Sequence, residues 1–135
     1  MADRPAFAEL LRALARERAR TLVVGGLAKK LHGETGEAHD CCLWYDADEA
    51  NAARVYRALG RIGAQLDGIS PLDLADVDYE FRHGNDDGEL CLLGGLDGVT
   101  FADAWDERLE THWRDVPICV IGRQALRASE LAERP

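Results

Sequence analysis

Short apolar or alternating segments are interspersed with longer segments of helical periodicity, and this pattern constrains the fold more than any other feature of the sequence. The short segments have strand-like lengths of four to six residues. Glycine and polar turn residues at 83–88 predict a hairpin between two of them. Hairpins combined with helical crossovers predict a mixed sheet rather than a purely parallel one. The predicted strands are residues 21–24, 41–45, 77–82, 89–93, 109–113 and 117–121.

The remaining periodic segments predict helices that flank this sheet. In the first, Phe7, Leu10 and Leu14 recur at the spacing of one helical face. Asp46 and Glu49 resemble a capping box at the start of another. Residues 68–76 suggest an irregular connection. The predicted helices are residues 5–18, 27–31, 46–62, 101–107 and 124–133, and together with the strands they predict an α/β (α+β) fold.

Length and composition fit one domain, residues 1–135, with a sizeable core. The chain is 47% hydrophobic and 30% charged, as expected for a globular protein. No apolar run approaches the roughly 20 residues that span a bilayer, and the N-terminus lacks the apolar stretch of a signal peptide. We therefore expect a cytoplasmic protein with no membrane association, in which the four cysteines stay thiols.

The net charge of −9 bears on possible partners. Because 25 acids outnumber 16 bases, electrostatic binding to duplex DNA is not expected. A small ligand or a basic protein partner remains compatible with this charge. The sequence does not indicate the oligomeric state.

Residues 39–46, HDCCLWYD, contain an unusual combination of acid and thiols at the start of a strand. Side chains alternate along a strand, so Asp40 and Cys42 should share one face and Cys41 should face the opposite side. Earlier in the chain, a strand runs into Gly25-Gly26 and then a helix, an arrangement that lets the backbone approach a phosphate. Two glycines after a strand are more often simply a tight turn. Lys29 and Lys30 follow and either attract a phosphate or form a solvated helix face.

The order of these segments resembles the nucleotidyltransferase superfamily, specifically its small AbiEii-like members. After Gly25-Gly26, the A-x-x-x-H-G pattern of that group is matched by Ala28, His32 and Gly33. An acid-opened strand with Asp40 and a helix with Asn51 follow. Residues 96–105, LDGVTFADAW, resemble a further family segment, so the resemblance extends over nearly the whole chain.

The resemblance implies a mixed sheet flanked by helices, a nucleotide triphosphate held at Gly25-Gly26, and three carboxylates that bind two magnesium ions. This chain departs from the family at the positions that bind the metal ions. Asp40 matches the first carboxylate, but Cys42 and Cys91 occupy the second and third positions. Glu130 stands where relatives tend to have a lysine. Thiols are poor ligands for magnesium, so we expect that the set of catalytic carboxylates is degenerate and no longer holds two magnesium ions.

Three functions remain open. The first is a catalytically degenerate protein that binds a nucleotide at Gly25, Gly26, Lys29 and Lys30, or binds a protein partner in a regulatory or toxin–antitoxin-like pair. The second is an active magnesium-dependent nucleotidyltransferase in which Asp40 is catalytic and other acids substitute. The third is a zinc or thiol site, since thiolates with a carboxylate or imidazole hold zinc. Its ligands would come from Asp40, Cys42, Cys91 and His39. Without metal, the cysteines simply fill space.

Overall fold

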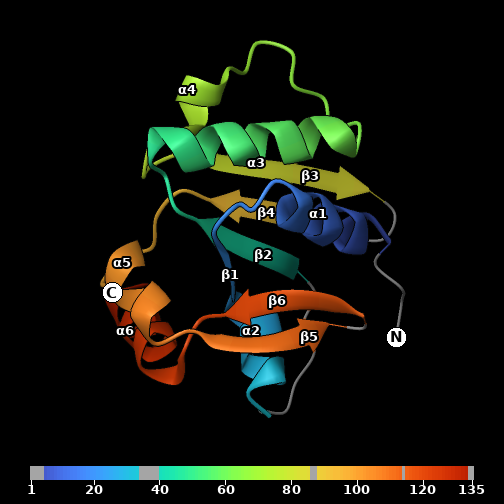
Figure 1. Ribbon diagram of the computed structural model, residues 1–135. Coiled ribbons are helices and arrows are strands. Elements are labelled where there is room, and N and C mark those ends of the chain that lie inside the picture. The colour runs from blue at the N-terminus through green and yellow to red at the C-terminus, as the bar shows by residue number, and fades with distance from the viewer. Residues whose placement is uncertain (1–4, 34–39, 86–87, 114, 134–135) are drawn as a thin grey trace.

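The computed structural model describes residues 5–33, 40–85, 88–113 and 115–133, and its strands form one six-stranded sheet. The strand order is β3-β4-β2-β1-β6-β5 (Figure 1). The strands are β1 (Thr21–Val24), β2 (Asp40–Tyr45), β3 (Glu80–Asn85), β4 (Gly88–Leu93), β5 (Leu109–Trp113) and β6 (Val116–Val120).

Parallel and antiparallel pairs are combined in the sheet, as the sequence predicted. β1 and β2 are antiparallel neighbours at its centre. β4 is parallel to β2, and β6 is parallel to β1. Each of these outer neighbours belongs to an antiparallel hairpin, β3–β4 on one side and β5–β6 on the other. The sheet therefore consists of a central pair extended by two hairpins.

The helices are close to their predicted positions, with two corrections. The third helix begins after Asp48, whose side chain accepts a hydrogen bond from the Asn51 backbone N–H, so Asp46 is not its cap. Within the predicted irregular connection, Ser70 and Asp73 form a capping box around a short helix. The helices are α1 (Pro5–Arg16), α2 (Gly25–Leu31), α3 (Glu49–Arg61), α4 (Pro71–Leu74), α5 (Phe101–Asp106) and α6 (Arg123–Glu133). None of the helices described is long and apolar enough to cross a membrane.

The strand β3 also differs from its prediction, because it covers residues 80–85 rather than 77–82. The alternation of residues 77–82 resembles a strand, but Val77 is 65% exposed and lies in a turn. Tyr79 ends this turn, and its carbonyl accepts a hydrogen bond from the Gly94 N–H at 2.9 Å. The connection that contains Val77 thus packs against the end of β4 without extending the sheet.

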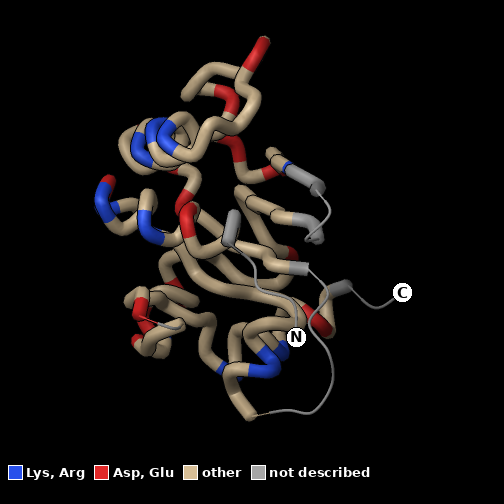
Figure 2. The backbone as a smooth tube through the Cα atoms, turned by 90° about the vertical axis from the view of Figure 1, so that its right-hand side faces the viewer, with Lys and Arg blue, Asp and Glu red and all other residues tan. Residues whose placement is uncertain are grey.

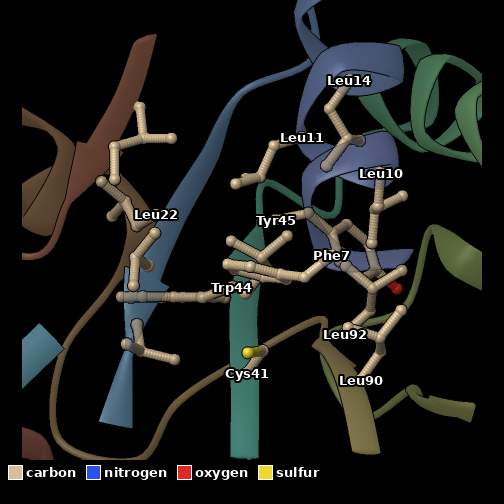
Figure 3. Close-up of a cluster of buried hydrophobic side chains, with 14 of the residues drawn as sticks. Phe7, Leu10, Leu11, Leu14, Leu22, Cys41, Trp44, Tyr45, Leu90 and Leu92 are labelled. Carbon is tan, nitrogen blue, oxygen red and sulfur yellow. The ribbon is translucent and has the colours of Figure 1, made fainter. Parts of the chain in front are cut away.

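Helices cover both faces of the sheet. α1 and α3 lie side by side on one face (Figure 1). Figure 3 shows apolar side chains of α1 with residues of β2 and β4 in the buried core on this side. Cys41 belongs to this core and is 3% exposed. On the other face, Trp44 meets Phe101 of α5 edge to face, with ring centroids 5.1 Å apart.

The connection from α1 to β1 has an unusual backbone. After α1 ends at Arg16, Arg18 adopts a φ of 59°, in the left-handed region that glycine usually occupies. The Ala19 N–H then bonds the Leu14 carbonyl at 3.0 Å, which closes the helix end. This tight ending places Glu17 against α3 and directs the chain into β1.

Candidate functional site

A cavity of about 230 Å³ lies beside the Gly25-Gly26 turn, between the sheet and α6. We call it the Gly25 cavity. Its wall combines the end of β1 and the start of α2 with residues of β2, β4 and α6 that are far apart in the sequence. The lining residues are Val24, Gly25, Gly26, Lys29, Cys42, Leu93, Leu96, Leu126, Ser129 and Glu130.

Gly25 makes the sharp turn from β1 into α2 with a φ of 69°. A side chain in this left-handed conformation is strained, which explains a glycine here. Space is not the limitation, because a Cβ added to Gly25 would lie 4.0 Å from the Cys42 Cβ, an ordinary contact. The antiparallel register pairs Val24 with Cys42, so the turn and the thiol necessarily lie together.

The two thiols that replace the expected carboxylates are on the same face of adjacent strands. β2 and β4 run parallel with Cys42 opposite Cys91, and residues paired in this way project to the same side of a sheet. Cys91 is 2% exposed and Cys42 is half-buried at the cavity wall. Leu93, two residues after Cys91 on the same face, also lines the cavity. The strand register therefore places Cys42 next to the Gly25 turn and Cys91 opposite Cys42, while the role of these residues in a site stays a prediction.

The positive charge at the cavity is opposed by an acid from α6. Lys29 Nζ lies 2.5 Å from Glu130 Oε2, and both side chains line the cavity. Lys30 is exposed and is not among the lining residues. An anion entering the cavity would therefore meet Glu130 together with Lys29. Sequence reasoning had noted Glu130 as a departure from the family but had no signal for its pairing with Lys29.

Two predicted site residues are not defined by the structure. His39 lies outside the described residues. Asp40 opens β2 opposite Glu89 of β4, but its side chain is not among those described. Among the side chains that are described, no group of three His, Cys, Asp or Glu residues is arranged to hold a metal ion. The metal assignments of Asp40, Cys42, Cys91 and His39 thus remain predictions.

His32 and Asn51, the histidine and asparagine that match the family pattern, connect segments of the fold through hydrogen bonds. His32 Nε2 lies 2.7 Å from the Ile121 carbonyl oxygen, which can only accept, so Nε2 carries the proton and donates. Arg123 donates to the His32 carbonyl at 2.7 Å. Asn51, 3% exposed, accepts from the Arg20 N–H at 2.7 Å and donates to the Asp46 carbonyl at 2.8 Å. Both side chains join separate segments rather than face the Gly25 cavity.

Comparisons with known proteins identify the fold. No protein-family model matches the chain, and no curated protein sequence matches it. Among solved structures, the chain is similar to a candidate nucleotidyltransferase from Thermotoga maritima, with a TM-score of 0.61 and 17% sequence identity. The match covers 95% of this chain and 84% of the other. The mixed sheet flanked by helices is therefore a nucleotidyltransferase-like fold, as predicted.

Proposed function

We propose that this chain is a member of the nucleotidyltransferase superfamily, related to its small AbiEii-like group, that acts by binding and not by nucleotidyl transfer. One observation carries the proposal: Cys42 and Cys91 are paired across β2 and β4, beside the Gly25 turn. These are the positions at which the resemblance leads us to expect carboxylates. The ligand is a weakly held nucleotide or a cytoplasmic protein partner, in a regulatory or toxin–antitoxin-like pair.

The residues beside the turn do not fit the magnesium ions that the family implies. Magnesium prefers hard oxygen ligands in octahedral geometry, whereas thiols are soft. The described wall of the cavity offers Cys42, the Ser129 hydroxyl and the Glu130 carboxylate. Ser129 donates to the Leu126 carbonyl at 2.8 Å, and Glu130 pairs with Lys29. We therefore assign no transfer step to this site.

The size and charge of the cavity also favour weak nucleotide binding. Its 230 Å³ falls below the range of roughly 300 to 1,000 Å³ typical of small-molecule sites. Four of its lining residues are aliphatic, namely Val24, Leu93, Leu96 and Leu126. Glu130 offsets the charge of Lys29, so a triphosphate gains less from Lys29 than it would from a lysine without an acidic neighbour.

A transfer assay tests the proposal directly. The wild-type protein is incubated with each labelled nucleoside triphosphate, magnesium or manganese, and protein or RNA acceptors. We expect no label transfer above that of an Asp40→Ala control. Transfer that Asp40→Ala abolishes would instead establish the active enzyme, with acids supplied from positions such as Asp86, Asp87 or Glu89, of which nothing structural is described beyond the backbone of Glu89.

A variant in which the expected carboxylates are restored serves as a positive control. Cys42→Asp/Cys91→Asp returns carboxylates to both positions and should introduce magnesium-dependent nucleotide binding, measured by calorimetry. The matched variant Cys42→Ser/Cys91→Ser should not. If the restored variant folds, as judged by circular dichroism, and still binds no nucleotide with magnesium, the assigned positions are wrong.

The adjacency of two thiols makes zinc the second candidate. Cys42 and Cys91 occupy opposed positions on neighbouring strands, and zinc needs further ligands such as Asp40 or His39. Elemental analysis of protein purified without a metal-affinity tag separates the two functions. We expect far less than one zinc per chain. One equivalent that is lost in Cys42→Ser would favour the zinc site over the binding function.

A further inference from the structure

Arginines are concentrated in two segments of an otherwise acidic chain. Residues 12–20 and 52–62 together contain seven arginines and one glutamate, a net charge of +6. Since the whole chain carries −9, the rest of it carries −15. The two segments belong to α1 with its C-terminal turn and to α3, which pack side by side. Basic residues lie on both helices, which Figure 2 shows nearly end-on at its left side.

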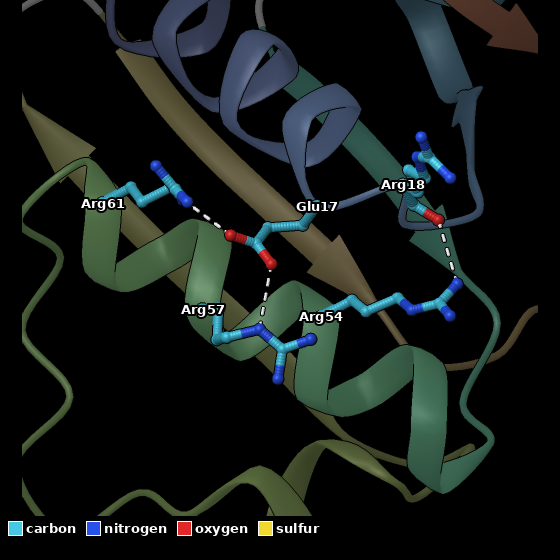
Figure 4. A network of polar contacts seen from close by, with 5 residues as sticks. All are labelled: Glu17, Arg18, Arg54, Arg57 and Arg61. Carbon is cyan, nitrogen blue, oxygen red and sulfur yellow. Dashed lines mark hydrogen bonds and ion pairs between the residues drawn. The ribbon is translucent and has the colours of Figure 1, made fainter.

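Two of these arginines contact Glu17 and two more lie beside them on the same side of the molecule; we call Arg18, Arg54, Arg57 and Arg61 the arginine face (Figure 4). Arg57 Nε donates to Glu17 Oε1 at 2.9 Å, and Arg61 Nε donates to Oε2 at 2.6 Å. Arg54 donates to the Arg18 carbonyl at 3.3 Å. The three arginines of α3 recur at spacings of three and four residues, so they share one side of that helix.

Glu17 holds the guanidinium groups of Arg57 and Arg61 in place and leaves most of their N–H donors available. Its side chain is 11% exposed, whereas those of Arg57 and Arg61 are 58% and 52% exposed. Each of these two contacts uses an Nε–H, and each guanidinium has four further N–H donors. The hydrogen bonds from Arg57 and then Arg61 lower the pKa of Glu17, which therefore stays ionised at neutral pH. Fixed guanidinium groups lose less freedom when they bind, which favours recognition of a carboxylate or phosphate.

We propose that the arginine face binds a short acidic peptide segment of a protein partner. Carboxylates of that segment would accept bidentate hydrogen bonds from Arg54, Arg57 and Arg61. The inference draws on the proposed function only in assuming that the chain binds a partner. The face lies on α1 and α3, across the sheet from the Gly25 cavity, so variants of one region leave the other intact.

Three features favour an acidic peptide over nucleic acid. The arginines of α3 extend over residues 54–61, which is about 10 Å of helix and matches a short segment. The remainder of the chain carries −15, which would repel a long polyanion that extended beyond the basic segments. Single-stranded nucleic acids are usually held by base stacking, whereas the aromatic residue within 54–61, Tyr56, is half-buried and donates its hydroxyl to the Ile69 carbonyl at 3.0 Å.

Fluorescence anisotropy with a labelled peptide of alternating Glu and Ala tests the proposal. We expect binding that weakens as salt is raised. Arg54→Glu and Arg57→Gln should each weaken binding by about tenfold, since each removes a charge-assisted hydrogen-bond donor. Arg57→Lys should recover only part of the loss, because lysine keeps the charge but not the planar fork. Thermal melts verify that each variant is folded.

The matched control is Arg127→Glu, an equal charge reversal at an exposed arginine of α6. This variant should bind the peptide as the wild type does. The proposal is overturned if the wild type binds no peptide, if Arg127→Glu weakens binding as much as Arg54→Glu, or if single-stranded RNA competes better than the peptide. A Cys42→Ser variant should bind the peptide as tightly as the wild type does. This result would show that the arginine face binds independently of the Gly25 cavity.

Discussion

The Gly25 cavity and the arginine face contain the same kinds of charged groups in opposite proportions. In the cavity, one acid opposes one lysine, and the remaining wall is largely aliphatic or thiol. On the arginine face, one half-buried acid pairs with two of four exposed arginines, which leaves an excess of positive charge. A charge that is matched pair by pair gives little attraction for a new ion, whereas an excess held in fixed geometry attracts one. The comparison favours our proposal that a charged ligand binds at the arginine face rather than at the Gly25 turn.

The largest effect is expected at Asn51, which joins the chain just before β1 to the chain just after β2. Its side chain makes three hydrogen bonds, one from the Arg20 N–H and two to the Arg20 and Asp46 carbonyls. Asn51→Ala removes all three hydrogen bonds at part-buried backbone groups, so we expect a loss of about 2 to 3 kcal/mol in the free energy of unfolding. Urea denaturation measures this loss. A loss below about 1 kcal/mol would mean that water replaces the side chain readily.

The next effect concerns the turn at the cavity. Gly25→Ala should destabilise the protein by about 1 to 2 kcal/mol, because alanine is strained at a positive φ although space is available. Gly60→Ala is the matched control within α3. It has open space around it and no positive φ, so it should stabilise by about 0.5 to 1 kcal/mol. If both variants were stabilised, or both destabilised, the backbone conformations assigned to Gly25 and Gly60 would be contradicted.

A smaller effect is expected when the acid at the centre of the arginine face is neutralised. Glu17→Gln leaves Arg57 and Arg61 without their carboxylate and should lower the melting temperature at neutral pH. The reduction should be modest, because both arginines are exposed to solvent. Thermal melts of both proteins at several pH values measure it.

The pH dependence of this effect has a defined sign. The folded state lowers the pKa of Glu17 below its ordinary 4.5, so the stabilisation is present above that value and is lost as the pH falls through the lower, folded-state pKa. The gap between the wild type and Glu17→Gln should therefore close under acidic conditions. A gap that stays constant with pH would mean that the ion pairs do not stabilise the fold.

The smallest effect is expected at Arg18. Its left-handed backbone would suit glycine, so Arg18→Gly should relieve strain, while the greater freedom of glycine in the unfolded chain offsets part of the gain. A net stabilisation of up to about 1 kcal/mol in chemical denaturation is expected. Destabilisation would show that the side chain of Arg18 makes a contribution larger than its backbone strain.

The fold was more predictable from the sequence than the site was. Short strands and helical periodicity are local signals, so the elements of the mixed sheet were placed within a few residues. Strand β3 was misplaced because the alternation around Val77 imitates a strand, and α4 was missed although Ser70, Pro71 and Asp73 are typical of a helix start. At the start of α3, the sequence pattern favoured Asp46 as the cap, whereas Asp48 accepts the hydrogen bond from the Asn51 N–H.

Site chemistry was harder to predict because it depends on pairs that are distant in sequence. Strand register, which follows from alternation and resemblance together, correctly brought Cys42 to Cys91. The pairing of Lys29 with Glu130 depends on how α6 packs, for which the sequence offers no local pattern. The arginine face had a visible signal in the spacing of Arg54, Arg57 and Arg61, but its organisation around Glu17 depends on the packing of α1 against α3.

The order of the strands also has a consequence for synthesis on the ribosome. β1 is the first strand in the chain but the fourth across the sheet. Its residue Val23 pairs with Val120, near the other end of the sequence. Contacts of such high sequence separation form late, and domains generally fold as units. Until β6 has left the exit tunnel, one side of β1 remains an unpaired edge, open to pairing with other nascent chains. A ribosome that stalls before β6 would therefore release a fragment prone to aggregation.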